Sequence, residues 1–124
     1  MSDPTTALIH ALAEHMTAKE EWDCFAMVLG LDGVKVNSVF GFAYSADGAV
    51  ESVAASPYRI KDAVKGYTDS YFKAGDPLPL KLLVQFDRTN GKYEVTFEDK
   101  DASRWELTPE TFHDIPEQLR PHFG

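Results

Sequence analysis

The stretch from Leu80 to Asp99 places the tightest limits on how this chain can fold, because its alternation and its turn residues both predict one β-hairpin. Asn90 and Gly91 suit a two-residue type I′ turn, in which both central residues have positive φ. That turn sets apolar residues opposite one another in two pairs, Phe86 with Val95 and Val84 with Phe97. We therefore expect these four side chains to be buried together on one face of a sheet.

The other face of this hairpin is polar and acidic. The same register sets Asp87 opposite Glu94, and like charges in direct opposition destabilise a sheet. A basic patch on a protein partner would relieve that repulsion. The candidate partner-binding surface therefore consists of five acidic residues, Asp87, Glu94, Glu98, Asp99 and Asp101. Three alternatives are that nearby lysines or solvent screen the pair, that a helix or the C-terminal tail covers this face, or that the acids serve solubility.

A second hairpin is predicted for residues 22–31 and 34–44, with Asp32-Gly33 as its two-residue turn. In this register Phe25 faces Phe40 and Leu29 faces Val36, which makes one large apolar face. The opposite face carries small residues, including Cys24, and suits close approach of a helix or a partly covered sheet surface. These should be inner strands, and residues 49–53 should add a short strand that continues the meander.

Two main helices are predicted, at residues 4–18 and 57–74. Asp3-Pro4 and Ser56-Pro57 each combine an N-cap residue with proline at the first helical position. Apolar residues follow at helical spacing in both segments, and in the second they form the stripe Ile60, Val64, Tyr67 and Tyr71.

The C-terminal tail predicts shorter elements. Residues 104–107 alternate like a short edge strand, and Thr108-Pro109 restarts a helix by the same cap-and-proline signal. The residues expected to dock this tail are Phe112, Ile115, Leu119 and Phe123. Together the patterns predict one α+β domain over residues 1–124, with a mainly antiparallel sheet of five or six strands, two helices on one face and a short helical tail.

Charge and cysteine content exclude several classes of function. Twelve Lys and Arg against twenty Asp and Glu give a net charge of −8, which repels nucleic acid and anionic lipid and attracts a cationic partner. A single cysteine allows no intramolecular disulfide, and no signal peptide or membrane-length apolar run is visible. We therefore expect a cytoplasmic protein that does not enter a membrane.

Motifs for catalysis, cofactors and metals are missing from the sequence. It has no glycine-rich phosphate loop, no Gly-x-Ser-x-Gly and no His-Glu-x-x-His. His10 and His15 are five residues apart on the first helix, and His113 and His122 lack metal-type spacing. Cys24 has no histidine close in sequence to activate it. We therefore expect no enzymatic activity, no cofactor and no metal.

The order of these segments resembles the YezG-like antitoxin family, the immunity proteins of bacterial polymorphic toxins. The resemblance rests on Glu21-Trp22 before the first hairpin, Gly75-Asp76-Pro77-Leu78, Gly91-Lys92-Tyr93 and a late Arg104-Trp105. Leu78 stands where the family has tryptophan, and Tyr93 where it has phenylalanine. The resemblance implies a cytoplasmic α+β protein without catalysis that binds and neutralises a cognate toxin, often a nuclease. It transfers no toxin-contact residues.

The leading functional hypothesis is therefore an immunity protein for a basic toxin, since an acidic inhibitor gains association rate by electrostatic steering. One alternative is a small-ligand or regulatory binding domain with a pocket between the first hairpin and the helix of Tyr67 and Tyr71. Another is an enzyme with an unrecognised site.

Overall fold

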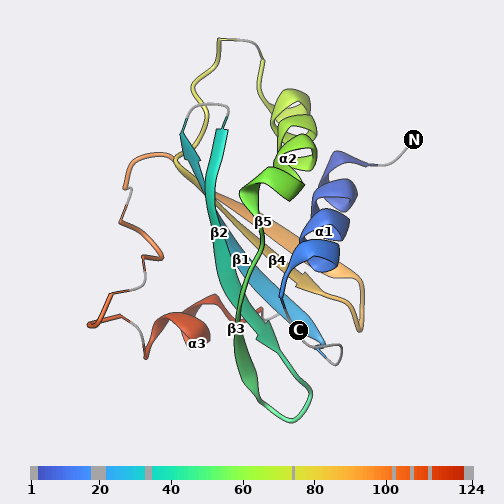
Figure 1. Cartoon of the computed structure of the whole chain (residues 1–124), viewed down its shortest axis with the longest axis vertical. Coiled ribbons are helices and arrows are strands. Elements are labelled where there is room, and N and C mark those ends of the chain that lie inside the picture. Colours follow the sequence, from blue (N-terminus) through green and yellow to red (C-terminus); the bar gives the residue numbers. More distant parts are fainter. Residues whose placement is uncertain are drawn as a thin grey trace.

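The computed structural model describes residues 3–17, 22–32, 35–73, 75–101, 103–106, 108–111 and 113–121. It confirms the α+β class, with five antiparallel strands in the order β3-β2-β1-β4-β5. Helices α1 and α2 lie side by side on one face of the sheet, and α3 lies on the other (Figure 1). The elements along the chain are α1 Pro4–His15, β1 Cys24–Asp32, β2 Lys35–Tyr44, β3 Val50–Ala54, α2 Pro57–Tyr71, β4 Lys81–Asp87, β5 Lys92–Glu98 and α3 Ile115–Leu119.

Both main helices begin where the sequence predicts. The side chain of Asp3 accepts a hydrogen bond from the backbone N–H of Thr5 at 3.4 Å, which caps α1. Ser56 occupies the N-cap position of α2 but makes no side-chain capping bond. The helices end at His15 and Tyr71, earlier than the expected residues 18 and 74, which lie outside the described residues.

The core on the helix side contains apolar residues from both helices and four strands. Helix α1 buries Leu8 and Leu12 against the sheet, and helix α2 buries Ile60 and Val64, as the helical spacing predicts. The strand residues fully or almost fully buried in this core include Phe25, Met27, Leu29, Val39, Val53, Leu82 and Val84.

A second core lies on the other face of the sheet, which we expected to suit the close approach of a helix or to be partly covered. Trp105, Ile115 and Leu119 from the tail pack there, as predicted for Ile115 and Leu119. The sheet residues beneath them are Ala26, Val28, Phe42, Tyr44 and Leu83. The central strands are therefore covered on both faces, and the tail forms one of three layers.

The 80–99 hairpin exists, but its predicted register is wrong by two residues. Asp87 lies opposite Lys92 and Val84 opposite Val95, because the turn contains four residues, 88–91, instead of two. Gly91 has a φ of 75° and its N–H donates to the carbonyl of Asp87 at 2.8 Å. A shift of two preserves the faces, so Val84 and Phe97 still share one.

This correction removes the repulsive pair on which the partner surface was argued. Glu94 faces Gln85, not Asp87. The burial of the four apolar residues also differs from the prediction. Val84 is fully buried and Phe86 and Val95 are half-buried, whereas Phe97 is 42% exposed. The expectation that Phe97 is buried is therefore wrong.

The predicted register of the first hairpin is also wrong, and here the faces of β2 are reversed. Phe25 pairs with Ala43, and Ala26 pairs with Phe42. The register shifts between Gly30 and Leu31, and Asp32 pairs with Lys35, so the turn lies one residue later than expected at positions outside the described residues. From Val39 onward, the odd-numbered residues of β2 consequently face the helices, and the aromatic residues Phe40, Phe42 and Tyr44 face the tail. Val36, which precedes the irregularity, still packs on the helix side.

The tail departs further from its prediction. Arg104 and Trp105 lie in a turn, not in an edge strand, and Trp105 has a φ of 64°. Thr108-Pro109 begins a turn, and the helix starts only at Ile115 with Pro116 in its first turn. Leu107, Phe112 and Phe123 lie outside the described residues.

The cross-strand neighbours Leu82 and Phe97 should differ sharply in their contribution to stability. Leu82→Ala should lower the free energy of unfolding by roughly 2–5 kcal/mol, because Leu82 is fully buried. Phe97→Ala should cost less than about 2 kcal/mol, because its ring already contacts water. Urea denaturation of both variants measures the difference, and equal losses would contradict this assignment of burial.

Candidate functional site

The candidate site is the surface formed by the described residues of 94–121, from β5 through the C-terminal tail, which we call the tail face. A cleft of about 370 Å³ lies between the tail and the sheet. Gln85 and Thr96 line it from the strands, and Trp105, Thr111 and Gln118 line it from the tail. The tail runs along the side of the sheet opposite α1 and α2 (Figure 1).

Glu98, at the end of β5, anchors the start of the tail. Its Oε1 accepts from a guanidinium N–H of Arg104 at 2.7 Å, and its Oε2 accepts from the backbone N–H groups of Lys100 and Asp101 at 3.1 Å. The bond from Arg104, followed by the two backbone bonds, lowers the pKa of Glu98 to about 2. Lys81 completes the anchor, since its Nζ donates to the carbonyl of Arg104 at 2.8 Å.

The end of the tail is held by side chains from the inner strands. Tyr44 donates its hydroxyl to the carbonyl of Pro116 at 2.6 Å, and Gln85 donates to the carbonyl of Leu119 at 2.8 Å. The guanidinium of Arg120 stacks over the ring of Tyr44 at 4.6 Å from its centroid. Burial raises the pKa of Tyr44, so this hydroxyl remains a neutral donor at physiological pH.

The tail face holds most of the net charge of the chain. Residues 94–117 contain two basic residues, Lys100 and Arg104, and eight acidic ones, Glu94, Glu98, Asp99, Asp101, Glu106, Glu110, Asp114 and Glu117. Seven of these acids are exposed, and Glu98 is half-buried. With Arg120, which pairs with Glu117, residues 94–120 carry five of the eight units of net negative charge, on a framework of hydrogen bonds.

The structure divides the five predicted partner residues into two groups. Asp87 accepts from the N–H of Thr89 at 2.9 Å inside the hairpin turn, and Asp101 accepts from the N–H of Ser103 at 2.9 Å. Together with Glu98, these acids satisfy local backbone groups. Glu94 and Asp99 are exposed and take part in no ion pair among the described residues.

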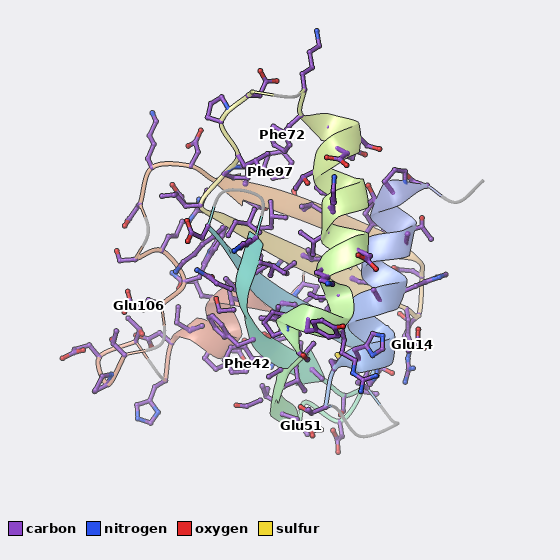
Figure 2. The ribbon with its side chains drawn as sticks, turned by 45° about the horizontal axis from the view of Figure 1, so that its top comes forward. Glu14, Phe42, Glu51, Phe72, Phe97 and Glu106 are labelled. Carbon is purple, nitrogen blue, oxygen red and sulfur yellow. The ribbon has the colours of Figure 1, made fainter. Side chains whose placement is uncertain are left out.

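The five predicted partner residues did not include the acids of the later tail. Glu106, Glu110 and Asp114 are exposed and lie in the segment that covers the sheet. Their signal in the sequence was the density of acids after residue 94, not strand alternation. Glu106 projects from the tail on the side opposite Glu14 of α1 (Figure 2).

The small-ligand hypothesis placed a pocket beside Tyr67 and Tyr71. Tyr67 is buried, with 3% of its surface exposed, and its ring centroid lies 4.6 Å from that of Tyr71. Tyr71 is 54% exposed, and its hydroxyl lies 3.0 Å from Thr5 Oγ1. A larger hollow of about 1120 Å³ lies elsewhere, around Trp22, Asp47 and Arg88. It is open to solvent, whereas small-molecule sites enclose most of their ligand.

Cys24 is a potential nucleophile, and His, Asp and Glu side chains are potential metal ligands. Burial, followed by the charge of Asp87, raises the pKa of Cys24, which disfavours the reactive thiolate. Within the described ranges, no three His, Cys, Asp or Glu side chains gather where they could hold a metal ion. His122 lies outside those ranges. No described helix is long and apolar enough to cross a membrane.

Comparison with known proteins gives no relative: no protein-family model, no curated protein and no solved structure matches the chain. The resemblance to the YezG-like antitoxins stays a prediction.

Acid should release the start of the tail. The folded-state pKa of Glu98, about 2, lies below its value in the unfolded chain, so its stabilising contribution is complete above about pH 4.5 and is lost as the pH falls toward 2. The indole N–H signal of Trp105 in NMR spectra, which reports a buried ring, should move toward its solvent-exposed position over this range. Glu98→Gln should remove this step from the titration. An identical step in the variant would show that another group controls the tail.

Proposed function

We propose that this chain binds and neutralises a basic protein toxin, and that the acidic tail face is its contact surface. The observation that carries the proposal is the concentration of net charge in residues 94–117, on a tail held against the sheet by hydrogen bonds and apolar packing. The resemblance to toxin-immunity proteins supplies the class of partner.

Fixed surface charge suits rapid capture of an oppositely charged protein. Surface acids raise the rate of encounter with a basic partner, and preorganised groups lose less entropy when the complex forms. Glu94, Asp99 and Glu106 enter no ion pair among the described residues, so their charge is not offset by a bound Lys or Arg. A nuclease is a suitable partner, because its substrate-binding surface must attract phosphate and is therefore basic.

The test uses the C-terminal domain encoded by the neighbouring upstream reading frame as the candidate toxin. Co-expression of the chain should restore growth of cells that produce this domain, and the two purified proteins should form a complex. The double variant Glu106→Lys with Glu110→Lys should slow association by about tenfold or more at low salt and by less at high salt. Folding stability should change by less than about 0.5 kcal/mol, because both side chains are exposed.

A matched control separates the tail face from net charge. Glu14→Lys with Asp62→Lys makes the same charge change at exposed positions on α1 and α2, the helices on the face of the sheet opposite the tail (Figure 1). This control should slow association far less than the tail variant. Equal effects of the two variants would place the toxin contact elsewhere, and failure to form a complex with wild-type protein would contradict the proposed function.

A further inference from the structure

The outer edge of β5 presents backbone groups that pair with no strand. Arg88 donates its N–H to the carbonyl of Asp23, the residue before β1, at 2.9 Å, so the backbone N–H and C=O groups of the even-numbered residues of β4 point toward β1. In an antiparallel ladder, the N–H and C=O of one residue point the same way and alternate along the strand. The odd-numbered residues of β4 therefore bond to β5, through pairs such as Leu83 with Thr96. The N–H and C=O groups that remain, directed away from the sheet, belong to Tyr93, Val95 and Phe97.

The opposite edge of the sheet, formed by β3, is partly closed by hydrogen bonds. On β3, the N–H of Thr17 donates to the carbonyl of Ala54 at 3.0 Å, and the N–H of Ala54 donates to Thr17 Oγ1 at 3.2 Å. The segment after α1 thus closes part of that edge. In the part of the chain that the structure describes, no hydrogen bond closes the outer edge of β5 in the same way. An open edge is a template for a further strand.

Exposed aromatic side chains stand on this edge. Tyr93 is 45% exposed and Phe97 is 42% exposed, although most large apolar residues of the sheet are buried. Phe97 lies beside Phe72 at the end of α2, with ring centroids 5.5 Å apart (Figure 2). A strand added to β5 would place its own side chains against these rings and remove them from water.

We propose that the added strand is β5 of a second copy of this chain, paired antiparallel with Val95 opposite its own counterpart. In this register Tyr93 faces Phe97 of the second copy, and Lys92 faces Glu98 of the second copy. Each pairing occurs twice by symmetry. The edge is thus complementary to itself in its aromatic residues, and Lys92 adds a cation beside a carboxylate that already pairs with Arg104.

Charge selects this register over its two neighbours. If the two-fold axis passes through Glu94 instead of Val95, the Glu94 carboxylates of the two copies lie opposite each other. If it passes through Thr96, Glu94 lies opposite Glu98 of the second copy. Like charges in direct opposition are unfavourable in both cases, whereas the Val95-centred pair contains none.

The resulting dimer would have one sheet continuing through both copies, with the main helices of both on one side and both tails on the other. The surface buried by one pair of short strands is small, so the association should be weak and reversible. The tail beyond β5 stays outside the paired strands, and the association does not depend on the proposed toxin binding.

Sedimentation equilibrium and amide hydrogen exchange test the proposal together. In about 0.15 M salt, where long-range repulsion is screened, the mean mass should rise toward that of a dimer between about 10 µM and about 1 mM. Over the same range the amide N–H groups of Tyr93, Val95 and Phe97 should exchange more slowly, while that of Thr96 should be unchanged because it already bonds to β4. A monomer throughout would overturn the proposal, and so would a dimer that leaves these three amides unaffected.

A charge variant tests the register. Lys92→Glu sets two acidic side chains opposite each other at both ends of the interface and should weaken dimerisation by about tenfold. Lys61→Glu makes the same change in charge on an early turn of α2 and should leave dimerisation near the wild-type level. Circular dichroism checks that both variants are folded. Equal dimerisation by the two variants would rule out the Val95-centred register.

Discussion

The strand β1 needs cover on both of its faces, and the rest of the structure depends on that constraint. Seven consecutive residues of β1, from Phe25 to Leu31, are buried. A strand with apolar side chains on both faces cannot lie at the surface of a two-layer domain, because either face would leave its side chains in water. It is central in the sheet, with β2 and β4 as neighbours. At Gly41 the neighbouring strand comes so close that a Cβ atom would overlap the carbonyl oxygen of Ala26.

The same constraint explains why an acidic segment is folded at all. A chain segment rich in exposed carboxylates gains little from packing, and such segments are commonly disordered. Here Trp105, Ile115 and Leu119 bind the segment to the bare face of the sheet. The apolar side chains supply the stability, and the carboxylates between them remain in water. Charge for recognition and cover for β1 therefore come from one stretch of sequence.

Alternation and helix caps predicted most of the elements, while registers and the tail were beyond local reasoning. A two-residue shift in the 80–99 hairpin left its faces intact, since side chains repeat every two residues. In the first hairpin, a later turn and the irregularity at Gly30 reversed β2, so the aromatic side of that strand was assigned to the wrong layer. The positive φ of Trp105 is adopted by few non-glycine residues, and packing in the second core decides it. The partner surface changed for the same reason, because it had been argued from a register.

The order of the elements along the chain has a consequence for truncated products. All five strands precede α3, so a chain that stops before the tail can still form the sheet, with Phe42 and Leu83 exposed on one side. Such a product presents an apolar surface that the tail covers in the full chain. Truncated products should therefore be targets for chaperones and proteases.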